Sequence, residues 1–466
     1  MSSRTLLVAW LIAIPAGVAA QQPRADIDRL GRDILKELIE INTTESSGST
    51  RTAAERKAAR LVAAGYPSSD VQVVGGTERK GNLVARYRGT GTRKPVLFMA
   101  HLDVVEARRE DWSMDPFVLT ERDGYFYGRG TLDVKGGAAT LVAGFARLRQ
   151  EGFKPDRDLI LALTTDEEGG PNNGIQWLLA NRRDLIDAEY AINLDSGGGE
   201  IRGGKVDALD VQAAEKVYAS FMLTVKNPGG HSSLPTKENA IYRLAAGLQR
   251  LSSFEFPVRT NEVTRAYFTS MAKLASASTQ ADDMRQVAAP QPDAAAARRL
   301  ADGSPFHNAL LRTTCVPTLL QGGHAENALP QTARATVNCR MLPDEPPDAV
   351  QQALVRTLAD PQIEVAPSGR PVPSPPSPLV PDVFRAIANA ARPLYGEVPV
   401  VPFMETGATD GLFLRNARMP VYGVSSIAYD PDDVRAHGKD ERILVRSYYE
   451  GIEFVYQLAT QLAAAR

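Results

Sequence analysis

From residue 26 to about residue 213, the chain alternates between segments with helical spacing of apolar residues and short segments that are apolar throughout. Helical spacing is found in residues 27–41, 52–64 and 136–150. Residues 96–100 and 159–163 are wholly apolar, which is typical of strands buried on both faces. This alternation predicts an α/β sheet.

The pattern changes at about residue 217. The segments that follow are predicted as strand 217–225, helix 239–251, strands 311–320 and 333–341, helix 348–358 and strand 363–366. Their order, βαββαβ, is that of a ferredoxin-like unit. Between its first helix and second strand, residues 260–303 are rich in Ala, Gln and Asp, and they are predicted to be helical and peripheral.

A proline-rich run, residues 371–378, then reads as a stiff linker, after which the α/β pattern returns with a strand at 420–424 and a helix at 444–464. The ferredoxin-like unit is therefore predicted to be inserted into the α/β unit. The predicted organisation is a signal peptide (1–20), a first catalytic part (21–215), an inserted lid or dimerisation domain (216–368) and a second catalytic part (369–466). A length of 466 residues favours two such domains.

The charge composition is informative mainly about which partners it disfavours. Charged residues make up 23% of the chain and nearly cancel, leaving a formal net charge of -2. This balance argues against nucleic acid or an anionic membrane surface as the main partner. We therefore expect a small-molecule or peptide substrate, whose charge is recognised locally.

The N-terminus has the layout of a cleavable secretory signal. Arg4 precedes an apolar run at residues 6–14, and small residues end at Ala20. The alternative, a membrane anchor, is disfavoured because the apolar run is shorter than the roughly 20 residues that a spanning helix needs. We expect export to the periplasm or the exterior, and no membrane span.

The only two cysteines are Cys315 and Cys339, which lie on the arms of the predicted hairpin, equidistant from Asn327. Either a disulfide or two buried free thiols is consistent with this placement. Two cysteines do not form a zinc cluster, so any metal site must use histidine and carboxylate ligands.

Acids or histidine follow four predicted segments. The residues are His101 and Asp103, Asp133 within the glycine-rich segment 128–137, the run Asp166 to Glu168, and Asp195. Sites in open α/β sheets form at the carboxyl ends of strands, so these groups should converge. Several converging carboxylates are unfavourable unless cations neutralise them. Histidine with carboxylates suits zinc, cobalt or manganese.

These segments, read together, closely resemble the di-zinc aminoacylase and carboxypeptidase family. The matching runs are FMAHLDVV (98–105), GRGTLDVKGG (128–137), TTDEEGG (164–170) and PGGHSS (228–233). Relatives in that family include glutamate carboxypeptidase, Gly-X carboxypeptidase and succinyl-diaminopimelate desuccinylase. The resemblance covers nearly all of the mature chain, in order and with family spacing. It implies a zinc-peptidase-type α/β catalytic domain with an inserted lid or dimerisation domain.

The resemblance also implies a ligand set for two zinc ions per subunit, with cobalt or manganese as alternatives. His101 and Asp195 would hold one ion, Glu168 and His437 the other, and Asp133 would bridge both. The peptide bond after Asp133 is expected to be cis, as in the family.

Glu167 is assigned as general base, next to the ligand Glu168. It would take a proton from the metal-bound water, and the resulting hydroxide would attack the scissile carbonyl. Glu167 would then deliver the proton to the leaving nitrogen. Asp103 is expected to accept a hydrogen bond from His101 and to fix its tautomer.

The inserted domain is expected to recognise the substrate. In relatives, the counterpart of His231 stabilises the oxyanion in the active site of a partner subunit. Asn327 and Arg340 resemble a pair that grips the substrate carboxylate, because Arg offers a planar fork that matches it. Gly407 lies where relatives present backbone to that carboxylate, although Ala408 departs from the hydroxyl residue that is common there.

His307 and His324 have no motif around them, and both are read as structural. The predicted function is an exported di-zinc hydrolase that cleaves an amide bond next to a free carboxylate, as a carboxypeptidase, dipeptidase or N-acyl-amino-acid hydrolase. The alternatives are an aminopeptidase and a non-catalytic binding protein on the same scaffold. A homodimer through the inserted domain is one possibility, and the enlarged stretch 260–303, which could take the place of a second subunit, leaves a monomer open as the other.

Overall fold

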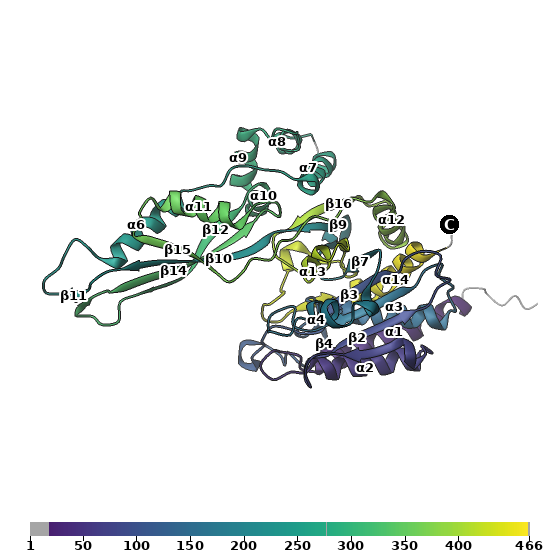
Figure 1. The fold of residues 1–466 in the computed structure, drawn as a ribbon. Coiled ribbons are helices and arrows are strands. Elements are labelled where there is room, and N and C mark those ends of the chain that lie inside the picture. Colours follow the sequence, from purple (N-terminus) through teal and green to yellow (C-terminus); the bar gives the residue numbers. More distant parts are fainter. Residues whose placement is uncertain (1–17, 276, 465–466) are drawn as a thin grey trace, which may run out of the picture.

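The computed structural model describes residues 18–275 and 277–464. Most of the predicted signal peptide lies outside the described residues. Figure 1 shows a rounded body from which an elongated arm projects to one side. We call the body, built on the nine-stranded sheet, the main unit, and the arm, built on a four-stranded sheet, the small unit. None of the helices in the described ranges has both the length and the apolar character needed to cross a membrane.

The main sheet confirms the predicted α/β architecture. Its strands are β1 (Val71–Val74), β2 (Asn82–Tyr87), β3 (Val96–His101), β6 (Leu159–Thr164), β7 (Tyr190–Asn193), β8 (Gly198–Arg202), β9 (Lys205–Glu215), β16 (Val400–Glu405) and β17 (Val421–Gly423). Their order is β1-β2-β6-β3-β7-β17-β9-β16, with β8 paired to β9. Strands β6, β3, β7 and β17 run parallel, so their carboxyl ends meet at one edge. A separate small sheet joins β4 (Thr120–Arg122), β5 (Tyr125–Tyr127) and β18 (Arg442–Leu444).

Helices cover both faces of the main sheet. One face carries α1 (Val18–Glu40), α2 (Thr50–Ala63), α3 (Lys135–Gln150), α12 (Pro381–Tyr395) and α14 (Val445–Ala463), and the other carries α4 (Gly174–Asn181), α5 (Arg183–Ile186) and α13 (Gly411–Asn416). Neighbouring residues of β3 therefore enter different cores: Phe98 packs on the first face and Leu97 on the second. This two-sided burial explains why β3 and β6 are apolar throughout.

The small unit has the predicted βαββαβ order. It contains β10 (Val217–Lys226), α6 (Ala240–Ser252), β12 (Thr314–Gly322), β14 (Thr332–Met341), α11 (Pro347–Leu358) and β15 (Ile363–Ser368). The strand order is β12-β14-β10-β15, antiparallel throughout. A short ribbon of β11 (Gly230–His231) and β13 (Ala328–Leu329) lies at the end of the arm that is remote from the main unit (Figure 1).

Residues 260–303 are helical, as predicted, but they are not peripheral. They form α7 (Glu262–Leu274), α8 (Thr279–Val287) and α9 (Ala294–Gly303), and α10 (Pro305–Leu311) follows. We call these four helices the insert. Val263 and Phe268 of the insert share one buried core with Phe403 and Met404 of β16. The insert therefore covers the end of the main sheet, and β12 begins after α10, at Thr314, rather than at Leu311.

Cys315 and Cys339 form a disulfide between β12 and β14. The two residues are direct partners in the register of these antiparallel strands. Of the two readings that the sequence left open, the structure therefore has the bridge, which ties the edge strand β12 to its neighbour.

The proline-rich segment 371–378 is packed against the main unit rather than bridging open space. Ser377 donates its backbone N–H to Ala213 and its hydroxyl to the carbonyl of Val421. Ser374 donates to the buried carboxylate of Glu215 at 2.8 Å. The return from the small unit to the main unit is thus held by buried hydrogen bonds on β9 and β17.

Candidate metal centre

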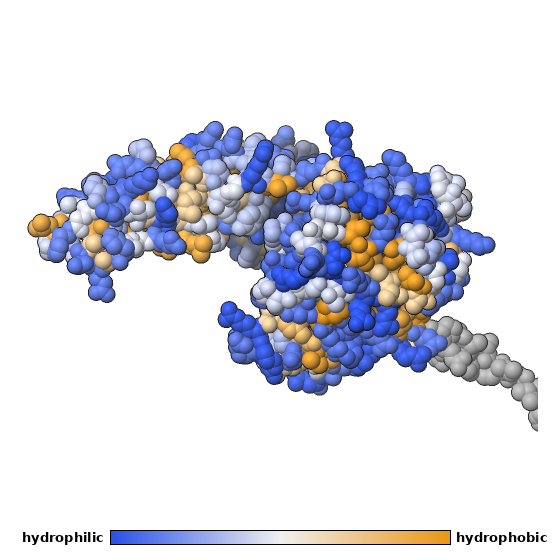
Figure 2. All heavy atoms as spheres, turned by 60° about the horizontal axis from the view of Figure 1, so that its bottom comes forward, coloured by the Kyte–Doolittle hydropathy of each residue, from blue (hydrophilic) through white to orange (hydrophobic). Residues whose placement is uncertain are grey.

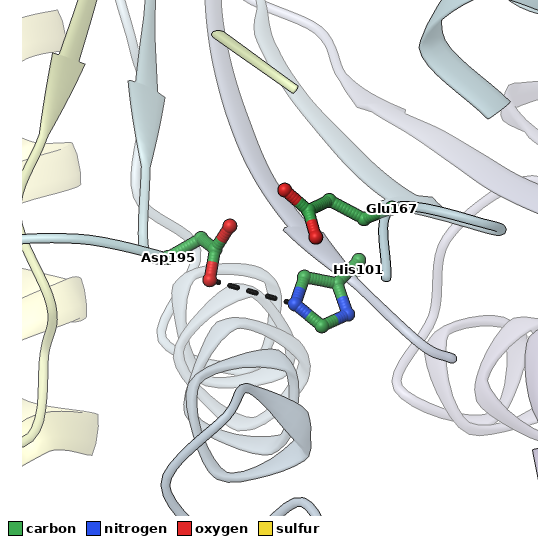
Figure 3. A group of neighbouring side chains, drawn as sticks. All are labelled: His101, Glu167 and Asp195. Carbon is green, nitrogen blue, oxygen red and sulfur yellow. Dashed lines mark ion pairs between the residues drawn. The ribbon is translucent and has the colours of Figure 1, made fainter. Parts of the chain in front are cut away.

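The predicted ligands converge at the carboxyl edge of the central parallel strands. His101 is the last residue of β3, Glu167 and Glu168 follow β6, and Asp195 follows β7. In Figure 3 the carboxylates of Glu167 and Asp195 face the imidazole of His101 from two sides. Parallel strands bring residues far apart in sequence to the same edge, as the sequence predicted.

Asp133 reaches the same place by a different route. It does not follow a strand of the main sheet but lies in the turn between β5 and α3. Gly128 and Gly130 in this turn have φ angles of 156° and 89°, which side-chain-bearing residues rarely adopt. The peptide bond between Asp133 and Val134 is cis, as the resemblance implied.

A buried acid that the sequence reading missed holds this turn. The carboxylate of Glu441 accepts the backbone N–H groups of Gly130 (3.0 Å), Leu132 (2.8 Å) and Asp133 (3.0 Å). It also pairs with Arg129 at 2.6 Å, and Arg129 donates to the backbone carbonyl of His437 at 3.3 Å. The Arg129–Glu441 pair therefore joins the Asp133 turn to the His437 loop. In the sequence, the only sign of Glu441 is its place in the charged run 439–441 after His437.

Asp133 lies between two imidazoles and presents one oxygen to each. Its Oδ1 is 3.1 Å from His101 Nε2, and its Oδ2 is 2.9 Å from His437 Nε2. Asp195 Oδ1 lies 3.4 Å from His101 Nε2, and Glu168 Oε1 lies 2.9 Å from His437 Nε2. Two ligands held about 2.0–2.2 Å from one tetrahedral ion are separated by about 3.3 Å. The donor set thus fits two ions that share Asp133.

Glu167 borders the same space. One of its carboxylate oxygens lies within 4.8 Å of the facing atoms of His101 and Asp195, close enough for these three residues to surround an ion. Glu167 is therefore adjacent to one ion site, while the side chain of Glu168 lies against His437.

Burial and mutual repulsion shape the electrostatics of this cluster. Burial raises the pKa of Asp195 to about 7, and burial with repulsion from Asp195 holds the pKa of Glu167 well above its ordinary value. Hydrogen bonds to Asp133 and Glu168 raise the pKa of His437 to about 10. Although burial lowers it, the neighbouring carboxylates hold the pKa of His101 well above its usual range. A site of this kind is stabilised by bound cations.

Asp103 acts differently from the expectation. His101 Nδ1 donates to the backbone carbonyl of Asp103 at 2.9 Å, while the carboxylate oxygen Oδ1 is 3.7 Å away. The other carboxylate oxygen accepts the backbone N–H of Glu168 at 3.0 Å. The main chain of Asp103 orients the imidazole because the chain turns directly after β3, and its side chain fixes the loop that carries Glu167 and Glu168.

A second acid that the sequence reading missed supports that loop from the far side. The buried carboxylate of Asp410 accepts hydrogen bonds from Thr164 Oγ1 at 3.2 Å and from Asn173 Nδ2 at 2.6 Å. Burial raises the pKa of Asp410 to about 6. Asn173 also donates to the carbonyl of Asp166, whose backbone has a φ of 57°. These contacts hold the loop in a conformation that is costly by itself.

The predicted substrate-binding residues are not brought together within one chain. His231 and Asn327 are exposed neighbours on the remote β11–β13 ribbon, where Ser232 donates to the carbonyl of Asn327. Arg340 is near the other end of β14, stacked on the ring of Tyr218. Eight residues of strand, about 27 Å, separate Arg340 from the start of β14. The expected pairing of Asn327 with Arg340 therefore fails in a single chain, and Asn327 groups with His231 instead.

The remaining predicted residues are placed as follows. Gly407 follows β16, and its N–H donates to Glu405 Oε1 at 3.2 Å, so this donor is already used. Glu405 borders a cavity of about 390 Å³ whose wall also includes Asp133 and Asp195. His307 is buried and His324 is exposed, and neither belongs to the groups of metal-ligating atoms among the described residues.

Comparison with known proteins gives consistent matches. The family model described as "Peptidase family M20/M25/M40" matches residues 97–461. The human N-fatty-acyl-amino acid synthase/hydrolase PM20D1 is 30% identical over 375 residues, which cover 78% of this chain and 73% of that protein. The fold also matches two solved structures with low sequence identity. The M20 family metallo-carboxypeptidase Sso-CP2 from Sulfolobus solfataricus has a TM-score of 0.69 at 18% identity, covering 92% of this chain and 98% of that one. The Bacillus subtilis YXEP protein, a dinuclear metal binding peptidase, has a TM-score of 0.61 at 12% identity, covering 94% and 99%.

Proposed function

The chain belongs to peptidase family M20/M25/M40, and on this premise we propose that it hydrolyses an amide bond next to a free carboxylate with two bound metal ions. The products would be those of a carboxypeptidase, dipeptidase or N-acyl-amino-acid hydrolase. The observation that carries this proposal is the placement of one Asp133 oxygen against each of two histidines. The activities named for the human and Sulfolobus proteins support the same bond class.

The proposed ligands are His101 and Asp195 for one ion, Glu168 and His437 for the other, and Asp133 for both. Their nitrogen and oxygen donors suit zinc, and they accept cobalt or manganese as well. When bound, two such ions would lower the pKa of a water molecule and polarise the substrate carbonyl. Arg129 and Glu441 would keep Asp133 and His437 at the spacing that this arrangement requires.

Glu167 is the proposed general base. Its carboxylate borders the His101–Asp195 site, and its raised pKa allows it to hold a proton between two steps. It would accept a proton from the attacking water as the new carbon–oxygen bond forms. It would then give that proton to the leaving nitrogen as the carbon–nitrogen bond breaks, releasing one carboxylic acid and one amine.

We further propose that the protein is a homodimer in which His231 and Asn327 act in the site of the second copy. Both lie at the remote end of the arm, where they cannot serve their own metal centre without a large movement (Figure 1). The edge strand β12 exposes Val316 (55%), Leu319 (63%) and Leu320 (69%), and hydrophobic side chains are visible along the arm in Figure 2. An edge strand with apolar side chains favours pairing with a second copy.

Export remains part of the proposal. It rests on the layout of residues 1–20, and the Cys315–Cys339 disulfide agrees with an oxidising compartment. N-terminal sequencing of protein recovered outside the cytoplasm should find a chain that begins at about residue 21. A mature chain that still begins at Met1 would contradict export through this signal.

The test of the activity is release of a free amino acid from dipeptides and N-acyl amino acids, measured with zinc-loaded and metal-stripped protein. We expect turnover only with metal, and only when the carboxylate beside the scissile bond is free. C-terminally amidated versions of the same substrates are the matched control. Cleavage of amidated peptides with a free amine would indicate an aminopeptidase. Metal binding without any turnover would indicate a binding protein.

A further inference from the structure

A large cavity lies beside the metal centre, between β8–β9 and the insert. Its volume is about 1020 Å³, which is enough for a substrate group of ten or more heavy atoms. It shares Gly197, Glu405, Tyr429 and Val434 with the smaller cavity that borders Asp133 and Asp195. The two cavities therefore adjoin: the smaller one borders the proposed metal ligands, and the larger one extends under the insert.

The insert gives this cavity an apolar wall. Met271 and Leu274 of α7, Met284 of α8 and Phe306 of α10 all border it. Unbranched, flexible methionine side chains adapt readily to an aliphatic chain. This wall suits several methylene groups in a row.

The opposite wall, on β8 and β9, is acidic and incompletely paired. Arg202 lies 2.8 Å from Glu200 and 3.5 Å from Asp207 and so partly neutralises both. The carboxylate of Asp210 makes no hydrogen bond and no ion pair within the described residues. Burial, together with repulsion from Glu200 and Asp207, raises the pKa of the Asp210 carboxyl to about 7.

A second unpartnered polar group borders the same space. His307 of α10 is only 8% exposed, and its Nδ1 has no hydrogen-bond partner among the described residues. Buried polar atoms without partners are rare, because each costs about 1–3 kcal/mol. The Nδ1 atom itself is shielded from the cavity, so it is the carboxylate of Asp210, which lacks a hydrogen-bond or ion-pair partner in the described part of the chain, that points to a ligand with a polar head.

We propose that this cavity binds the acyl side of the substrate, and that the preferred acyl group is an aliphatic chain ending in a positively charged amino group, which pairs with Asp210. The proposal rests on the proposed hydrolase function and names its substrate class. A cationic head compensates the unpaired carboxylate, whereas an anionic head would meet four acids against the single guanidinium of Arg202; these acids are Glu200, Asp207, Asp210 and Glu405. Substrates with a second carboxylate on the acyl group are therefore disfavoured.

The test compares three substrates of equal length on the zinc-loaded protein: N-(6-aminohexanoyl)-, N-hexanoyl- and N-adipoyl-amino acids with the same leaving amino acid. The aminohexanoyl substrate should have the highest kcat/KM, at least about tenfold above the adipoyl one, because a charge-assisted contact replaces a repulsive one. Equal values for these two substrates, or a higher value for adipoyl, would overturn the proposal.

Two variants locate the effect. Asp210→Asn should lower kcat/KM for the aminohexanoyl substrate about tenfold and leave the hexanoyl substrate within about twofold. Asp282→Asn, a control on α8 of the insert, should change neither by more than about threefold, since Asp282 pairs with Arg285 and does not border the cavity. An equal loss on both substrates in Asp210→Asn would mean that Asp210 has only a structural role, which overturns the proposal.

Chain length gives a separate test of the cavity. Met271→Trp fills the apolar wall and should lower kcat/KM for both uncharged and charged six-carbon acyl groups, but not for an N-acetyl substrate. Unchanged six-carbon turnover would place the acyl group elsewhere. If no substrate is turned over at all, the hydrolase proposal fails instead, and calorimetry with hexylammonium and hexanol still tests the cavity: the wild-type protein should prefer the cation, and Asp210→Asn should not.

Discussion

Two histidines from equally specific sequence motifs have opposite surroundings in this molecule. His101 is 2% exposed, and carboxylates or carbonyls face both of its ring nitrogens. His231 is exposed at the end of the arm, and the hydrogen bonds of its ring are with Ser233 alone among the described residues. The proposed metal ligands therefore all come from one chain, whereas the ribbon that carries His231 lies at the far end of the arm from them (Figure 1).

The comparison separates chemistry that one chain can supply from recognition that, in the proposed dimer, needs a second chain. The metal-centre residues are fixed by buried contacts, so single changes there should affect each site independently of assembly. Residues on the ribbon should depend on the partner. The variants below test whether each group of residues acts within its own chain or in the site of a second copy.

The largest effect is expected for Glu167→Gln. Removal of the proposed proton acceptor should lower kcat by about 10³-fold or more while two ions stay bound, because this substitution leaves every proposed ligand in place. The measurements are kcat and metal content per chain. Glu168→Gln is the matched control, and its metal content should fall below two ions per chain. If Glu167→Gln loses metal instead, Glu167 is the metal ligand and Glu168 is the general base.

His231→Ala should lower kcat by about 10²-fold, the scale seen when one oxyanion donor is removed. The sharper test is to refold it together with Glu167→Ala. In mixed dimers one site loses both residues and the other regains both, so random pairing should restore about a quarter of wild-type activity. Mixed dimers that stay inactive would show that His231 does not act across an interface.

Glu441→Gln should weaken zinc binding by about 10- to 100-fold, the range found when groups behind metal ligands are changed. The side-chain amide introduced by this substitution would turn a donor toward backbone N–H groups that now donate to a carboxylate. Competition with a chelator measures the affinity. Asp433→Asn, which changes an acid paired with Arg435 and Arg442 nearby, is the control and should alter the affinity little. Equal affinities for all three proteins would remove Glu441 from the support of the metal centre.

The smallest change, and the most selective, is expected for Arg340→Ala. It should raise KM about tenfold for substrates with a free terminal carboxylate and leave poorly bound amidated substrates unaffected. Arg334→Ala, on the same face of β14 but nearer the remote ribbon, serves as the control. An equal response of both substrate classes would take Arg340 out of the carboxylate site.

The parts of this fold that the sequence predicts are those with a local pattern. Strands β3 and β6 are apolar on both faces because helices cover both faces, and their acidic or histidine ends meet because the strands are parallel. The helical nature of residues 260–303 was also readable from their composition. Their packing on β16 was not, because the partners Phe403 and Met404 lie more than a hundred residues away in sequence.

Within the site, the proposed metal ligands lie in sequence motifs, but the residues that hydrogen-bond the ligand-bearing segments do not. Glu441 and Asp410 are single acids without periodic surroundings, and only their hydrogen bonds in the folded chain show which segments they hold. The pairing of Asn327 with Arg340 was implied by the family resemblance, which does not reveal that the extended strand β14 separates the two residues within one chain. Contacts that cross a subunit boundary leave no periodic signal in one chain.

The packing of the insert has a consequence for how the chain is made. During synthesis, α7 to α10 leave the ribosome before β16, so the apolar surfaces of Val263 and Phe268 lack the strand that covers them until Phe403 and Met404 emerge. The insert therefore cannot complete its core before β16 of the main unit has been made, although the sheet of the small unit is complete by Ser368. Until β16 has been made, the apolar side of the insert helices is exposed and can bind chaperones or neighbouring chains. Synthesis of the last hundred residues supplies β16 and covers this surface.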